Sequence, residues 1–295
     1  MSRQQRDALA ALLPEGSVLF DEAMSRHSAA GVGGPAEAMV RADGIAGLKA
    51  VLAWAIDNGV EYRSWGRGSS TVVRDGGISG IVIGLGGEFE GAEIREQRRD
   101  EALVSAGSAC AARALCEMCA ARGLAVPDRI SGSCGTAGGA LFSGRGDDAP
   151  GFVDSVEEVT IVTKEGRELT LRGGALRFET GALKVPRTSV VVRAIFRLKA
   201  AGEQAVIRPA PKDMRISHVF SSGCKTCASA LIDEAGLRGV RVGGARVAID
   251  DPNAIVNEGN ATARDILVLM SLIRDRVREF TGVTLEHAIE ITGER

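Results

Sequence analysis

Two short glycine- and serine-rich segments are the parts of this chain best suited to hold a ligand. The first follows an apolar stretch and consists of Gly66, Arg67, Gly68, Ser69, Ser70 and Thr71. Glycine at 66 and 68 would keep side chains out of a ligand's path, and the hydroxyl and backbone N–H groups that follow suit pyrophosphate oxygens. A tight turn without any ligand is the alternative interpretation.

The second segment is equally small and uncharged, and it contains Gly132, Ser133, Cys134, Gly135, Thr136, Gly138 and Gly139. Neither segment fits the Rossmann pattern of a strand, G-x-G-x-x-G, a helix and an acidic residue some 20 positions later. Two small-residue loops about 60 residues apart instead suggest a cofactor that is bound from two sides. One loop would hold a pyrophosphate and the other would lie against a flat ring or a ribose.

Six cysteines include two C-x-x-C pairs, Cys116/Cys119 and Cys224/Cys227. Two such pairs could bind zinc and stabilise an interaction module. However, Cys116 and Cys119 lie in a helical pattern, where residues three apart share a buried face. We therefore predict reduced thiols and no metal site, while the pair at 224 and 227 lies in an expected loop.

The composition is that of an ordinary globular protein. The chain has 295 residues, 36 basic and 38 acidic side chains and a net charge of −2. This balance predicts neither nucleic acid nor a membrane as a partner. No apolar run of about 18 residues predicts a membrane helix, and the N-terminus lacks a signal-peptide pattern. A cytoplasmic location is expected, and the oligomeric state stays open.

Three segments are predicted, at 1–84, 85–203 and 204–295. The first should begin with an amphipathic helix that places Leu9, Leu12 and Leu13 on one face and ends before Pro14. Its other expected elements are a strand at 36–40, a helix at 45–58 and strands at 62–65 and 80–83.

The second segment should contain a helix at 110–122 and strands at 156–163 and 190–198. Glu165-Gly166 predicts a hairpin turn. The third should contain helices at 227–235 and 263–281, the latter capped by Thr262. Glycine accounts for 38 residues, which suggests close backbone approach.

A family resemblance rests on seven stretches that occur in a fixed order and cover the chain from about residue 25 to its end: 31–36, 66–70, 74–83, 135–141, 230–239, 242–245 and 256–262. With them the chain resembles the UDP-N-acetylenolpyruvoylglucosamine reductases, also called UDP-N-acetylmuramate dehydrogenases, of bacterial cell-wall synthesis. It resembles the shorter type, without an extra insertion in the third segment.

The resemblance implies an α+β protein with a two-domain FAD-binding fold of the vanillyl-alcohol-oxidase type and a C-terminal α+β substrate domain. It implies FAD as the cofactor, NADPH as the electron donor and a UDP-sugar enolpyruvyl substrate. In the family's reaction, hydride passes from NADPH to the flavin and then to the enol ether, and a protein acid protonates the adjacent carbon.

The sequence departs from the family at the positions that carry this chemistry. The Tyr-Arg-x-Ser motif is replaced by residues 178–181, with Glu179 in place of arginine. The Gly-Ser motif aligns with Gly223-Cys224 through a deletion, or with His218 without a gap. The C-terminal glutamate position is Ala288, and the second loop's asparagine is Gly144.

Two hypotheses follow. The chain is a working reductase that uses Cys224 as proton donor, with Glu290 or His287 in support, because strand alternation places Glu290 on the same face as Ala288. Alternatively it is a diverged FAD-binding paralogue with a different substrate or little turnover. Both predict slow reduction of the enolpyruvyl nucleotide.

Overall fold

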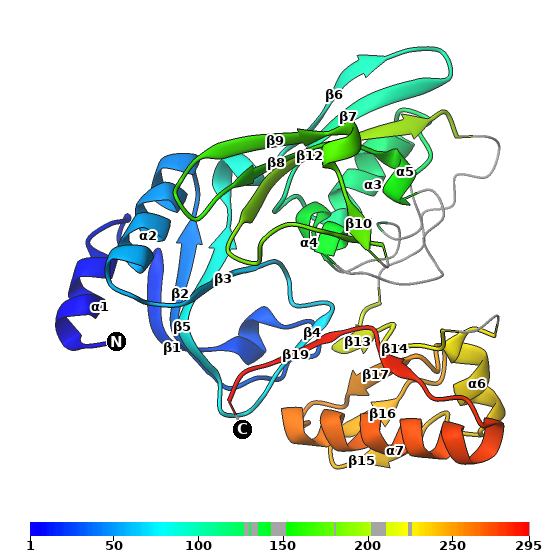
Figure 1. Ribbon diagram of the computed structural model, residues 1–295. Helices are drawn as coiled ribbons and strands as arrows, with labels where there is room; N and C mark the ends of the chain where they lie inside the picture. Colours follow the sequence, from blue (N-terminus) through cyan, green and yellow to red (C-terminus); the bar gives the residue numbers. More distant parts are fainter. Residues whose placement is uncertain are drawn as a thin grey trace.

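The computed structural model describes residues 1–126, 130, 135–142, 152–179, 181–201, 211–223 and 226–294. Its elements form three groups, each organised around a sheet (Figure 1). Both chain termini lie beside the first group, although the C-terminal strand follows the third group in sequence (Figure 1).

The first group is a four-stranded mixed sheet with the strand order β1-β2-β5-β3. Strand β1 is antiparallel to β2, whereas β2, β5 and β3 are parallel. The fully buried face of α2 carries Leu48, Val51, Leu52 and Ala55, as the helical spacing predicted. The bounds are α1 (Arg3–Ala10), β1 (Val18–Ala23), η1 (Met24–His27), β2 (Pro35–Ala42), α2 (Ile45–Asp57), β3 (Tyr62–Trp65), β5 (Ile78–Leu85) and η2 (Gly87–Phe89).

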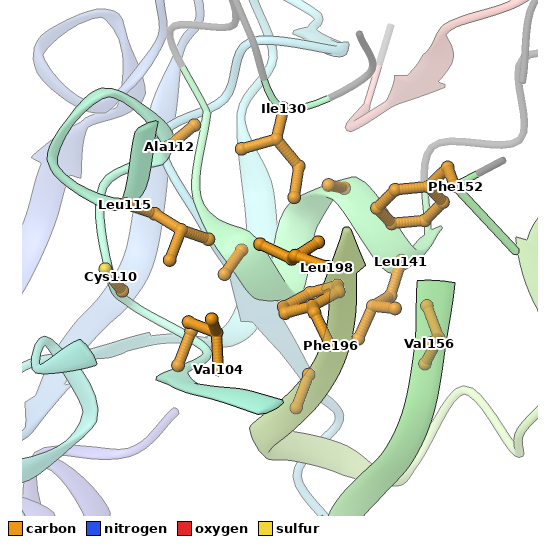
Figure 2. Close-up of a cluster of buried hydrophobic side chains, with 14 of the residues drawn as sticks. Val104, Cys110, Ala112, Leu115, Ile130, Leu141, Phe152, Val156, Phe196 and Leu198 are labelled. Carbon is orange, nitrogen blue, oxygen red and sulfur yellow. The ribbon is translucent and has the colours of Figure 1, made fainter. Parts of the chain in front are cut away.

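The second group is a five-stranded antiparallel sheet with the order β6-β7-β12-β8-β9. Leu115, Leu141 and Phe152 from its helices pack with Val104 and Phe196 of the sheet (Figure 2). The bounds are β6 (Ala92–Gln97), β7 (Glu101–Gly107), α3 (Ala112–Ala120), α4 (Ala137–Phe142), α5 (Phe152–Ser155), β8 (Val156–Val162), β9 (Glu168–Arg172), η3 (Gly173–Ala175), β10 (Phe178–Glu179), β11 (Ala182–Leu183) and β12 (Val190–Lys199).

The third group combines a small sheet, of order β13-β17-β16-β15, with two helices. Helix α7 begins after Thr262, whose hydroxyl accepts from the Asp265 N–H at 3.1 Å, so the predicted N-cap is confirmed. The bounds are β13 (Arg215–Ser217), β14 (Phe220–Ser221), α6 (Ala228–Glu234), β15 (Arg241–Val242), β16 (Ala245–Val247), β17 (Ala254–Asn257), α7 (Ala263–Thr281) and β18 (Glu286–His287).

A seam joins the first and third groups. Strand β4 (Thr71–Val73) pairs in parallel with β19 (Glu290–Thr292), close to the C-terminus. The two carboxylate oxygens of Asp75 accept from the N–H groups of Ala263 and Arg264, both at 3.0 Å, at the start of α7. The segment after the first glycine-rich loop is therefore held by the third group. The boundaries at 84/85 and 203/204 stay predictions.

Each predicted helix and strand is present, with its ends within two residues of those predicted, except at the N-terminus. Helix α1 buries Leu9 but ends at Ala10, so Leu12 lies beyond it and is 37% exposed. The Gly166 N–H donates to the Thr163 carbonyl, which confirms the predicted hairpin. Strand β6 was not predicted, because three of the six residues in its sequence AEIREQ are charged and none of its residues is fully buried.

Replacing Phe196 by alanine should lower the free energy of unfolding by about 3–5 kcal/mol. The Phe196 side chain is fully buried and its ring centroid lies 6.1 Å from that of Phe152. Chemical denaturation followed by circular dichroism measures the loss. Phe280→Ala is the matched control, because Phe280 is 66% exposed and should lose at most about 0.5 kcal/mol. Equal losses would contradict this account of the core.

Candidate cofactor site

The structure brings the two glycine-rich loops together. A β-carbon built at Gly66 would lie 3.1 Å from the Thr136 hydroxyl oxygen, and that oxygen accepts from the Gly139 N–H at 3.1 Å. Gly135, Thr136, Gly138 and Gly139 are described, whereas Gly132, Ser133 and Cys134 lie outside the described residues. Segments from two different groups thus contact each other where a cofactor held from two sides would lie.

The first loop is packed against its own chain more closely than the sequence suggested. Gly68 has φ +60°, and a β-carbon there would lie 2.7 Å from the His27 carbonyl oxygen and 2.9 Å from Ser28 Cα. Glycine is needed at 68 because the protein backbone occupies that space, whereas we had expected a ligand to occupy it. Arg67 is exposed, Ser69 and Ser70 are half-buried, and Thr71 already belongs to β4.

The second loop is held by backbone pairing with the segment after β7. The Ala112 N–H donates to the Gly135 carbonyl, and the Gly138 N–H donates to the Ser108 carbonyl at 2.9 Å. A β-carbon at Gly138 would lie 2.6 Å from Ser108 Cβ. Here too the glycine permits close packing of the protein against itself.

Two serine hydroxyls beside these loops bear on whether a cofactor fits. The Oγ atoms of Ser28 and Ser108 are buried and have no hydrogen-bond partner among the described residues. Ser28 lies against the first loop and Ser108 against the second. The site fits a ligand with polar atoms at both loops, as FAD has. Sequence reasoning missed both residues, because a single serine carries no pattern.

Glu290 lies next to the first loop. Its N–H donates to the Ser70 carbonyl at 3.0 Å, and its half-exposed carboxylate is 3.5 Å from Arg187 and 3.9 Å from Arg63. The Glu290 carboxylate thus lies near one arginine from the first group and one from the second, while its own strand follows the third group. These ion pairs favour a role for Glu290 in positioning the three groups. Its assignment as a catalytic residue stays a prediction. Cys224, the other candidate, lies outside the described residues.

Glu179, which we aligned with the family's arginine, lies on the short hairpin of β10 and β11. Its carboxylate is exposed and forms an ion pair with Lys184. A cation therefore already neutralises this carboxylate, which weakens the repulsion that we expected for an anionic substrate.

His218, the candidate from the ungapped alignment, lies beside the segment that contains Ala288. The Ala288 N–H donates to the Val219 carbonyl at 2.9 Å, so Ala288 adjoins the residue after His218. His218 has φ +54°, which is uncommon for a residue with a side chain and often marks a functional position.

Three cysteines lie together in the second group. Cys110, Cys116 and Cys119 are buried, free thiols, and Cys116 and Cys119 share the inner face of α3, as predicted. Burial raises the pKa of Cys116 to about 11 and that of Cys119 to about 12. Within the described ranges, no three His, Cys, Asp or Glu side chains are placed to hold a metal ion.

None of the helices in the described part of the chain is long and apolar enough to cross a bilayer.

Comparison with known proteins agrees with this geometry. Residues 36–172 match the family model of an FAD binding domain, and residues 208–292 match that of the C-terminal domain of UDP-N-acetylenolpyruvoylglucosamine reductase. Fold and site together define an FAD-dependent oxidoreductase with a C-terminal α+β domain.

The chain is similar throughout its length to reductases of that name. It is 34% identical to the one from Geobacter metallireducens over 95% of both chains, and 35% identical to the one from Desulfosudis oleivorans over 94% of this chain and 95% of that one. The crystal structure of the Thermus caldophilus enzyme matches with a TM-score of 0.73 and 26% identity, over 93% of this chain and 97% of that one. The chain belongs to the UDP-N-acetylenolpyruvoylglucosamine reductase family.

Replacing Gly138 by alanine should remove bound flavin and lower the melting temperature together. The added methyl would collide with Ser108 and displace the second loop. Flavin absorbance per protein and thermal unfolding measure the two effects. Gly91→Ala is the control, because a β-carbon at Gly91 meets nothing within 4 Å. Full flavin content in the Gly138 variant would refute this description of the loop.

Native Cys116 and Cys119 should react with iodoacetamide far more slowly than Cys227. With a pKa of about 11, only about one Cys116 thiol in 10³ is ionised at pH 8, and both helical thiols are shielded. Cys227 is exposed. Peptide mass spectrometry after timed labelling gives the rates, and denatured protein should label all three equally. Comparable native rates would show that α3 does not bury these thiols.

Proposed function

We propose that this protein catalyses the NADPH-dependent reduction of UDP-N-acetylglucosamine-enolpyruvate to UDP-N-acetylmuramate. The observation that carries the proposal is the full-length similarity to reductases of this name, which includes both the FAD-binding and the C-terminal domain. Bound FAD would accept hydride from NADPH and deliver it to the enol ether. Both nucleotides are cytoplasmic metabolites, so we infer a cytoplasmic location.

The residues proposed to hold FAD are those of the two loops, Gly66–Thr71 and Gly132–Gly139. Their contact at Gly66 and Thr136 supports this assignment. The substrate would lie between these loops and the third group. The β4–β19 pairing and the Asp75 contacts to α7 would fix that group against the flavin site.

The proton donor is a separate part of the proposal. Cys224 is a candidate because a thiol can donate a proton, and His218 is a candidate because its neighbour Val219 is bonded to Ala288. Imidazole titrates near neutral pH, which suits a general acid. Glu290 is the third candidate, although its two arginine neighbours support a role in positioning.

A second candidate function is that of a paralogue with a different substrate or little turnover. It is favoured by the changes at two positions, Glu179 and Ala288. The resemblance implies an arginine and a glutamate at these two positions. Removal of one positioned group can lower the rate about 10²- to 10³-fold.

Rapid mixing of the anaerobic holoprotein separates these proposals. NADPH should bleach the flavin absorbance, and adding the enolpyruvyl nucleotide should restore it about 10² to 10³ times more slowly than in relatives that keep the arginine. Glu179→Arg should speed only the second step. Glu165→Arg, which changes another exposed glutamate of the second group, should leave both steps unchanged. Wild-type reoxidation at about 10 s⁻¹ would show that other groups replace the missing ones.

The same experiment on three variants assigns the proton donor. Cys224→Ala, His218→Ala and Glu290→Gln should all keep reduction by NADPH. The variant that stops product formation identifies the donor. A nucleotide that binds but never reoxidises the wild-type flavin would support the paralogue with a different substrate.

A further inference from the structure

The side-chain hydroxyl of Ser108 has no hydrogen-bond partner among the described residues. The residue is only 7% exposed, and its Oγ makes no hydrogen bond to any described residue. Its backbone is satisfied, because its N–H donates to the Val192 carbonyl at 3.0 Å and its carbonyl accepts from Gly138. The hydroxyl, held beside the second glycine-rich loop, therefore remains available.

Ser28 repeats this arrangement beside the first loop. Its Oγ is buried and also lacks a partner among the described residues. The chain around it is fixed against the loop, since the Ala29 N–H donates to the Gly68 carbonyl at 3.3 Å and the Trp65 indole N–H donates to the His27 carbonyl at 2.9 Å. The Ser28 hydroxyl is thus held at the first loop by contacts within the first group.

Unpaired buried hydroxyls are uncommon, because a donor removed from water without a new partner raises the free energy of the folded state. Ser155 shows the ordinary situation in this protein. It is as buried as Ser108, at 8% exposed, but its Oγ donates to the Phe152 carbonyl at 2.6 Å. Among the described residues the Thr163 hydroxyl is also buried and unpaired, but it lies at the turn after β8, whereas Ser28 and Ser108 each adjoin one of the two loops.

We propose that Ser28 and Ser108 are FAD-binding residues whose hydroxyls donate hydrogen bonds to acceptor atoms of the cofactor, one from each side of the site. The inference rests on the FAD-binding part of the proposed function and is independent of the substrate and of turnover. It adds two residues outside both glycine-rich loops to the cofactor site.

The test measures the affinity of apoprotein for FAD and its thermal stability without FAD. Ser108→Ala and Ser28→Ala should each raise the FAD dissociation constant roughly fivefold to tenfold, the value of one hydrogen bond. The melting temperature of each apo variant should be no lower than that of the wild type, because alanine removes an unsatisfied group. Ser28→Thr, which keeps the hydroxyl, should bind FAD like the wild type.

Ser155→Ala is the matched control. It should lower apoprotein stability, because the Phe152 carbonyl loses its donor, and leave FAD affinity unchanged. If both alanine variants bind FAD as tightly as the wild type, the inference is overturned, and water is the partner of the two hydroxyls. Equal destabilisation of apo and holo forms at unchanged affinity would also overturn it, by showing a structural role. Wild-type protein that binds no FAD would remove the cofactor assignment itself.

Discussion

The parallel pairing of β4 with β19 is the contact on which the arrangement of the site depends. Strand β4 follows directly after the first glycine-rich loop, and β19 is its partner in the two-stranded sheet that they form. Asp75 reinforces the pairing by capping α7 from another group of the fold. The loop therefore takes its position from the third group as much as from its own sheet, and the two cannot be placed independently.

The sequence predicted those structural elements whose signals lie in residues close together in the chain. The periodic face of α2 and the Thr262 cap of α7 are local signals, and both elements lie where they were expected. The β4–β19 pair escaped prediction because each strand has three residues and the partners are far apart in the chain. Ser28 and Ser108 escaped because an unpaired hydroxyl is a property of its surroundings, which one sequence does not reveal.

In our interpretation of the sequence, the two glycine-rich loops resemble the family closely, whereas the positions aligned with its catalytic residues do not. The glycine-rich stretches are kept, and the loops they form contact each other at Gly66 and Thr136. Glu179, which we aligned with the family's arginine, forms an ion pair with Lys184. A carboxylate at this position does not disturb the fold, because neither side chain of the pair is buried.

The β4–β19 pairing joins two strands that are made at very different times during synthesis. Residues 71–73 leave the ribosome long before residues 290–292, so β4 waits without its partner while most of the chain is made. Contacts so distant in sequence form late and slowly, because a long loop must close first. Until residues 290–292 are made, the nascent chain therefore keeps β4 without this partner beside the first glycine-rich loop, and a strand in that state can pair with other chains.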